Sequence, residues 1–172
     1  MSVVIRRRAE YENIVRRVEP NLSLKKYKVY LVIRNIITIF ISMVITKENI
    51  NKFIEGSSMD CSNTGITHIE YIPDGITHLY CGVNKLTELP KLPESLTDLF
   101  CGDNRLTELP KLPESLTDLY CGGNRLTKLP NLPNVLKNLE CDENELTELP
   151  KLPESLMGLF CDNNNLPYEI NI

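Results

Sequence analysis

Six cysteines are the residues with the most chemical potential in this sequence, and they recur at a constant interval. They stand at positions 61, 81, 101, 121, 141 and 161. Thiols can form disulfides, bind a metal ion or act as nucleophiles, and their spacing helps to separate these uses. A constant interval of twenty residues indicates a chain that passes the same structural point once per repeat. The chemistry of the thiols therefore depends on how that repeat folds.

Four consecutive segments of the chain, covering residues 86–165, align without a gap. They read LTELPKLPESLTDLFCGDNR, LTELPKLPESLTDLYCGGNR, LTKLPNLPNVLKNLECDENE and LTELPKLPESLMGLFCDNNN. A weaker unit at 66–85 precedes them, and 56–65 forms half a unit. One unit cannot bury its apolar face alone, but stacked units can. The repeats therefore predict a solenoid.

The pattern of each repeat predicts which side chains point into the solenoid. Leu96, Leu99 and Cys101 point inward from a short strand and the turn after it, because strand side chains alternate between faces. Asn104 turns inward and hydrogen-bonds backbone groups of neighbouring turns, which creates a ladder along the stack. The returning segment closes the core with three leucines, at positions 106, 109 and 112.

The returning segment has no room for a helix in a repeat of twenty residues. Pro110 and Pro113 fix φ near −65° and lack an N–H donor, so this side is predicted to be extended or polyproline-like. Apolar residues at a spacing of three fit such a conformation better than an α-helix.

The shared phrase L-x-x-L-x-C-x-x-N-x-L matches the leucine-rich repeat phrase with Cys at its third apolar position. It resembles the short leucine-rich repeats of bacterial effector proteins and is similar to arrays in giant amoeba viruses. The resemblance covers residues 56–167. It implies a β-solenoid with parallel strands on a concave face and an extended, polyproline-like convex side. The departures are Thr64 in place of the first Asn, Glu70 in place of Pro, and the shortened last unit LPYEINI.

The cysteines are predicted to form a buried column on the inner side of the strands. Neighbouring strands lie about 4.8 Å apart, which is within disulfide range, but parallel Cβ vectors fit the disulfide torsion poorly. A column does not converge on one point, as zinc ligands must, and burial in apolar surroundings disfavours a reactive thiolate. We therefore expect free thiols that pack as small hydrophobic side chains. Reduced thiols favour an intracellular, cytoplasmic location, in the host cell if the protein is viral or an effector.

The candidate binding site is the concave face, which we define as the outward-facing residues of the strands. The residue before each later Cys gives a largely aromatic row: Tyr80, Phe100, Tyr120, Glu140 and Phe160. Two residues earlier stand His78, Asp98 and Asp118. Exposed aromatic rows are typical of contact surfaces, and like charges on neighbouring strands would be relieved by a cation. We predict a non-enzymatic protein-binding module whose partner offers a basic or amphipathic segment.

Two other interpretations of these positions remain open. The rings could stack across strands and only stabilise the sheet. The near-identity of the repeats also fits an expanding repeat protein without a dedicated partner.

Residues 1–55 differ from the rest in charge, with eleven Lys or Arg against five Asp or Glu, whereas residues 56–172 carry eight against eighteen. Repeat arrays need caps, so we predict a small helical N-terminal cap within 1–55 and a short tail at 168–172. The apolar segment 29–45 gives an alternative, a membrane-anchored display protein. Its uninterrupted apolar run, 36–45, is shorter than the about 20 residues that a spanning helix needs. No module for nucleic-acid binding is recognisable.

The sequence contains no recognisable motif of a catalytic site. His68 is predicted on the returning segment and His78 on the concave face, so they do not meet. Neither a Ser-His-Asp order, nor a phosphate-binding loop, nor metal-ligand spacing is present. Asp98, Asp103 and Asp118 could hold Ca²⁺ weakly, but calcium usually takes six to eight oxygens from a shaped loop. We therefore expect no enzymatic activity, no cofactor and no metal.

Overall fold

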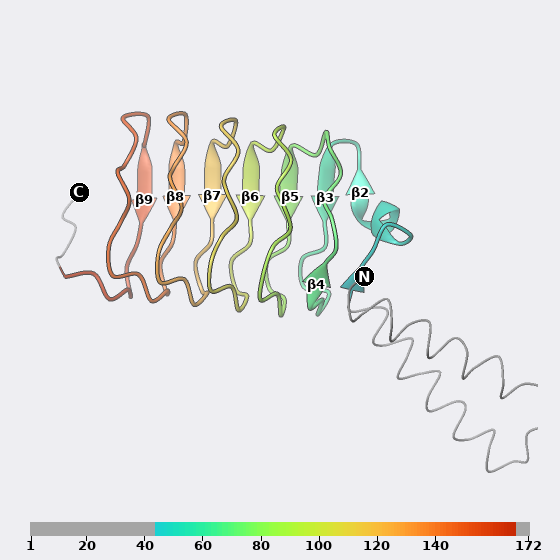
Figure 1. Cartoon of the computed structure of the whole chain (residues 1–172), viewed down its shortest axis with the longest axis horizontal. Helices are drawn as coiled ribbons and strands as arrows, with labels where there is room; N and C mark the ends of the chain where they lie inside the picture. The colour runs from blue at the N-terminus through green and yellow to red at the C-terminus, as the bar shows by residue number, and fades with distance from the viewer. Residues whose placement is uncertain (1–43, 168–172) are drawn as a thin grey trace, which may run out of the picture. The chain divides into compact units, whose positions relative to one another are not determined.

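The computed structural model of this protein describes residues 44–167 (Figure 1). The described part consists of short strands joined by long irregular segments. The elements are β1 (Val44–Ile45), the 3₁₀ helix η1 (Ile50–Phe53), β2 (Ile54–Glu55), β3 (Ser58–Asp60), β4 (His68–Ile69), β5 (His78–Tyr80), β6 (Asp98–Phe100), β7 (Asp118–Tyr120), β8 (Asn138–Glu140) and β9 (Gly158–Phe160).

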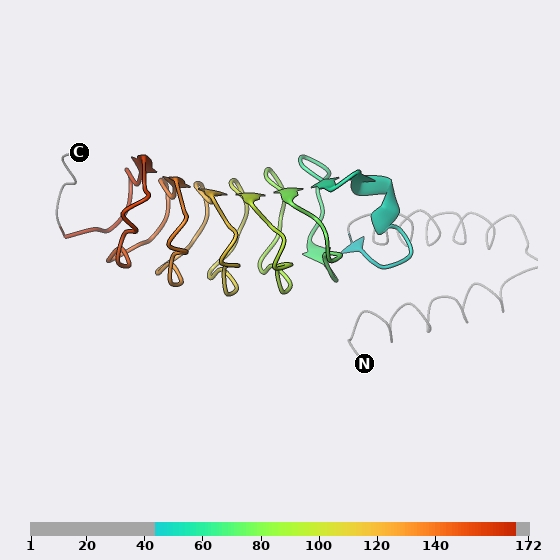
Figure 2. The same ribbon diagram turned by 90° about the horizontal axis from the view of Figure 1, so that it is seen from above.

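Seven of the strands form one sheet in the order β2-β3-β5-β6-β7-β8-β9. From β3 onward the pairs are parallel, and each residue lies beside its equivalent twenty positions later, as in Leu79–Leu99 and Leu99–Leu119. Figure 2 shows these strands along the inner side of a shallow arc, with the returning segments on the outer side. This arrangement confirms the predicted β-solenoid with parallel strands on its concave face.

The core is a column of leucines and cysteines that repeats with the strands. Leu99 and Cys101 are fully buried, as are their equivalents in the next repeat, Leu119 and Cys121. The returning segment adds Leu106, which is also fully buried. The inward positions predicted from strand alternation are therefore confirmed.

The asparagine ladder predicted from the sequence is present. Asn104 Nδ2 donates to the carbonyl of Cys101 at 3.1 Å and to that of Cys81, in the preceding turn, at 3.0 Å. Its Oδ1 accepts from the backbone N–H of Leu86 at 3.0 Å. The same pattern recurs at Asn124, Asn144 and Asn164. Each Asn satisfies buried backbone groups of two turns and so fixes their spacing.

The returning segments carry no helix in the described repeats. Each ends in a tight turn, such as that closed by the Leu96 N–H and the Pro93 carbonyl at 3.1 Å. A second backbone contact repeats every twenty residues, for example from the Arg105 N–H to the Leu86 carbonyl at 2.9 Å. Proline and tight packing thus give the extended convex side that the sequence predicts.

Residues 44–55 pair with the first repeat units. Strand β1 runs parallel to β4, and β2 runs antiparallel to β3. Within 44–55 the predicted helix is limited to η1, a single 3₁₀ turn with buried Ile50, because strand pairing dominates there. The rest of the predicted helical cap lies outside the described residues, as does the tail at 168–172. The domain boundaries predicted from the sequence therefore stay predictions.

The membrane-anchor alternative depends on residues 29–45, of which only Val44 and Ile45 are described. Both are buried and form β1. Across residues 44–167, no helix has the length and apolar character needed to span a bilayer.

Candidate protein-binding face

Three rings on the concave face form a continuous stack. The ring centroids of Tyr80 and Phe100 are 4.8 Å apart with an interplanar angle of 18°. Those of Phe100 and Tyr120 are 4.3 Å apart at 5°. Parallel strands in register place equivalent side chains about one strand spacing apart, so the rings stack face to face. The cross-strand stacking predicted as one alternative is therefore present, and all three rings remain partly exposed.

The aromatic row is interrupted at β8. Glu140 lies beside Tyr120 in the sheet register, and Phe160 lies beside Glu140 on the next strand. Phe160 is 62% exposed and makes no ring contact with another aromatic side chain in the described range. The four aromatic residues predicted as one contact row are thus three stacked rings and one separate ring.

The polar row beside the rings consists of two pairs, His78 with Asp98 and Asp118 with Asn138. His78 Nε2 lies 3.5 Å from Asp98 Oδ2. Asp118 accepts from Thr117 Oγ1 and from Asn138 Nδ2, both at 2.6 Å. Asp98 and Asp118 lie side by side in the register as predicted, and each also accepts a hydrogen bond from the preceding Thr hydroxyl. These donors offset part of the repulsion between the two carboxylates.

The carboxylates of the concave face change the pKa of Tyr120. The pKa of its hydroxyl is raised, first by burial and then by the charges of Asp118, Glu140 and Asp98. Negative charge disfavours the phenolate, so this hydroxyl stays a hydrogen-bond donor. The concave face therefore joins apolar ring surface to a net negative potential.

Comparison with known proteins identifies the repeat type. No family model and no curated protein sequence matches this chain. Among solved structures, YopM from Yersinia enterocolitica matches with a TM-score of 0.66 and 33% identity, over 71% of this chain and 26% of that protein. The leucine-rich repeat domain of a Shigella effector matches with a TM-score of 0.67 and 25% identity, over 99% of this chain and 70% of that domain. YopM from Yersinia pestis, described as a leucine-rich effector protein, matches with a TM-score of 0.64 and 29% identity, over 92% and 42%.

This chain is a leucine-rich repeat protein of the bacterial-effector type. It spans about a quarter of the Yersinia enterocolitica protein, so the likeness concerns the repeats and not that whole protein. A solenoid of this kind offers an extended surface on which proteins bind.

The thiols of this leucine-rich repeat protein are free, and burial makes five of the six unreactive. Burial raises the pKa of Cys101 to about 12, and it also raises the pKa values of Cys81 and Cys121. Cys161 is less buried, and its pKa is raised by burial and by Asp162 and Asp142. No group of three or more His, Cys, Asp or Glu within 44–167 could hold a metal ion.

The backbone conformation of the turn after each Cys was not predicted from the repeat pattern. Val83, Asp103 and Glu143 have φ values of 55°, 53° and 51°, where Gly123 stands in the third full repeat with φ 65°. A β-branched residue in this region is strained, so Val83 is unexpected there. Asp142 was also missed: its Oδ1 is buried and has no hydrogen-bond partner within the described range. The sequence does indicate a difference here, because Asp142 follows Cys where the three preceding repeats have Gly.

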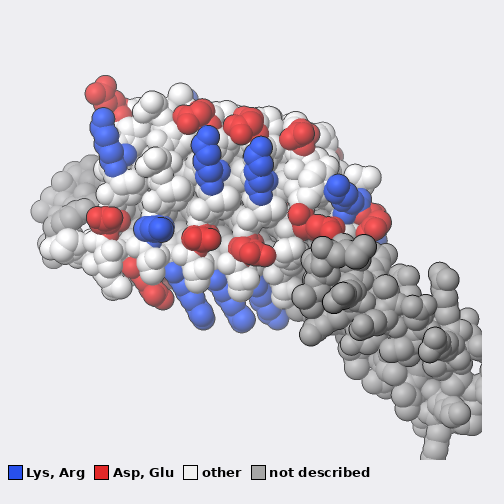
Figure 3. Space-filling view, viewed as in Figure 1, with Lys and Arg blue, Asp and Glu red and all other residues white. Residues whose placement is uncertain are grey.

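The convex side carries Lys, Arg, Asp and Glu in rows of mixed sign across the stack (Figure 3).

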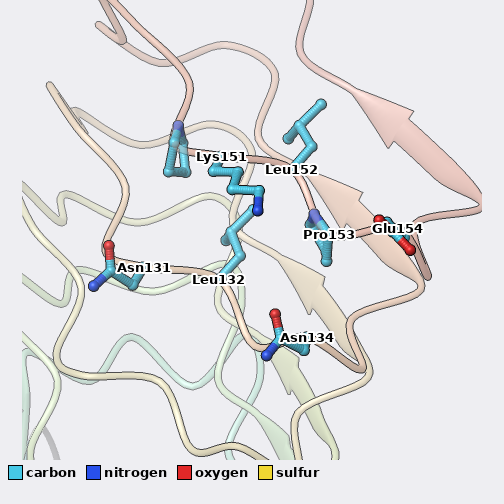
Figure 4. A pocket seen from close by; sticks show the side chains of 8 residues that line it. Asn131, Leu132, Asn134, Lys151, Leu152, Pro153 and Glu154 are labelled. Atoms are coloured by element: carbon cyan, nitrogen blue, oxygen red, sulfur yellow. The ribbon is translucent and has the colours of Figure 1, made fainter.

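A shallow cleft opens between two neighbouring returning segments. It is lined by Asn131, Leu132, Asn134, Pro150, Lys151, Leu152, Pro153 and Glu154 (Figure 4). The repeat pattern does not predict this cleft. It forms where the fourth repeat replaces Lys and Glu by Asn131 and Asn134, and its mixed lining indicates no particular ligand.

Proposed function

We propose that this protein is a non-enzymatic binding module whose concave face holds a basic or amphipathic segment of another protein. The observation that carries the proposal is the three-ring stack of Tyr80, Phe100 and Tyr120 beside a row of carboxylates. Half-exposed rings supply apolar contact area, and the carboxylates select the charge of the partner.

The charge of the repeat region supports a basic partner. Residues 56–172 carry eight Lys or Arg against eighteen Asp or Glu. On the concave face, Asp98, Asp118 and Glu140 add negative charge where the rings are exposed. Complementary charge speeds encounter and discriminates against acidic partners more than it adds affinity. Binding through this face should therefore weaken as salt is raised.

The stabilising role of the ring stack and the binding role are compatible. Rings that stack face to face still present their edges and hydroxyl groups to a ligand. The stack also orders the rings before binding, which lowers the entropy that association costs. The two roles differ in one measurable respect, because a purely stabilising stack would tolerate charged substitutions that leave the protein folded.

The proposed location is intracellular, and the host-cell cytoplasm if the protein acts as an effector. Its support is the buried column of free thiols, which persists most readily in a reducing compartment.

The test is capture of partners from cell extract by the tagged full chain and by two matched triple variants. The concave variant is Tyr80→Glu, Phe100→Glu, Tyr120→Glu. The control is Thr87→Glu, Thr107→Glu, Thr127→Glu, which adds the same charge at exposed convex positions. Thermal unfolding must show that both variants fold. The proposal expects a protein that the unmutated chain and the control capture, with at least tenfold weaker binding of the purified partner to the concave variant. Equal binding by all three would contradict it.

A further inference from the structure

The interruption of the aromatic row at β8 leaves a feature that the other repeats lack. Glu140 occupies the position that holds a ring in the strands on both sides, namely Tyr120 on β7 and Phe160 on β9. We call these three residues the Glu140 notch. One face of Tyr120 stacks on Phe100, and its other face lies toward Glu140.

The spacing of the notch suits a flat cation. Two strand spacings separate β7 from β9, so the two rings lie about 10 Å apart. A cation midway between the rings would lie about 5 Å from each, within the about 6 Å over which a cation interacts with the face of a ring. A guanidinium group can stack on a ring and pair with a carboxylate through its N–H edge at the same time.

The charge at the notch is not neutralised within the described residues. Glu140 has no side-chain hydrogen bond or ion pair there, and Asp142, two positions on, has a buried Oδ1 without a hydrogen-bond partner. Asp118 contributes further negative charge at Tyr120. The nearest cation in sequence is Lys137, about 10 Å away along an extended strand. A cation in the notch would therefore meet negative charge that no side chain of the described range neutralises.

The neighbouring position keeps the notch accessible. Gly158 stands on β9 where β6 and β7 carry Asp and β8 carries Asn. A Cβ added there would come within 2.9 Å of Asn138 Oδ1. Phe160 is 62% exposed on the last strand of the sheet, and Gly158 has no side chain that could cover its ring.

We propose that the Glu140 notch binds one arginine side chain of the protein partner, with the guanidinium between Tyr120 and Phe160 and paired with the Glu140 carboxylate. This inference rests on the proposed function of the concave face and adds a specificity position to it. Lysine would pair with Glu140 but lacks the flat surface for both rings, so arginine is preferred.

The first arm of the test uses Nα-acetyl-arginine amide, titrated into the ¹⁵N-labelled full chain at low salt and followed by NMR. The proposal expects saturable shifts centred on β7 to β9. It expects Glu140→Gln to weaken the probe about tenfold, since a charge-assisted pair becomes a neutral one. Nα-acetyl-citrulline amide, which is similar in shape but uncharged, should bind at least as weakly. An unchanged dissociation constant in Glu140→Gln, or shifts centred elsewhere, would overturn the inference.

The second arm separates this inference from the proposed function by using the captured partner. Glu140→Phe restores the residue type of the neighbouring repeats, so it should fold, and it removes the notch by extending the stack. We expect at least tenfold weaker partner binding in this variant. If the partner binds Glu140→Phe normally but fails to bind the concave triple variant, the proposed function stands and the notch is overturned. If the concave triple variant also binds normally, both are overturned.

Discussion

The two faces of the strands differ in how closely their residues repeat. Below, the inner side is the face toward the core, and the outer side is the concave face. On the inner side, Leu99, Cys101 and Asn104 recur in the next repeat with the same contacts and almost the same burial. On the outer side, the equivalent positions change from ring to carboxylate and from Asp to Asn or Gly. The inner side must close a core at every turn, whereas the outer side is free to vary. The core therefore specifies the fold, and the proposed ligand specificity depends on the departures on the concave face.

The largest expected difference is in the reactivity of the thiols in the middle and in the last repeat. A pKa of about 12 at Cys101 means that almost none of this thiol is thiolate at pH 8, and the fraction rises as pH approaches 12. Cys161 is less buried. Labelling of the native protein with iodoacetamide at pH 8 should therefore modify Cys161 at least about a hundredfold faster than Cys101. Mass spectrometry of timed samples checks this. Equal rates would show that the reagent reaches the buried thiols as easily as Cys161.

Removing one rung of the asparagine ladder should be the most destabilising single change considered. Asn124→Ala leaves the Leu106 N–H and the carbonyls of Cys101 and Cys121 without their side-chain partner. We expect a loss of about 3 to 4 kcal/mol in the free energy of unfolding. Urea denaturation measures it. Asn164→Ala, at a more exposed rung, should cost less, and a reversed order would contradict the ladder's role.

The two parts of the aromatic row should differ in stability by a smaller amount. Phe100→Ala removes contacts with both Tyr80 and Tyr120, so we expect a loss of about 1 to 2 kcal/mol. Phe160→Ala removes an exposed ring without ring contacts in the described range and should cost under about 0.5 kcal/mol. Denaturation of the two variants side by side decides this. Equal losses would mean that Phe160 packs more than its exposure indicates.

The smallest effect is expected at the turn after the cysteine, and it should be a gain. Val83 has a φ of 55°, which a β-branched side chain disfavours, and its side chain is exposed. Val83→Asn should raise the free energy of unfolding by about 1 kcal/mol, since Asn tolerates this conformation. Thermal unfolding checks the sign. Asp103→Asn, where the residue already tolerates this φ, is the control and should change little.

Much of the fold follows from the sequence because the repeat constrains it. Twenty-residue periodicity sets the register, and alternation around Leu99 and Cys101 identifies the inner side. The positions of Tyr80, Phe100 and Tyr120 on one face follow from the same rule. Two features cannot be predicted from the repeat: the conformation of Val83 and the buried Oδ1 of Asp142, which lacks a hydrogen-bond partner. Both depend on packing between turns. The strands at 44–55 were also missed, since their partners lie in the first, least regular repeats.

Binding through the concave face is tested most directly with a photo-reactive phenylalanine analogue placed at one position of the full chain. At position 100 it replaces a ring of the concave stack, and at position 107 it lies on the exposed convex side. If partners bind through the concave face, the partner captured by the unmutated protein is cross-linked from position 100 and not from position 107. Cross-linking from position 107 with none from position 100 would contradict binding through the concave face.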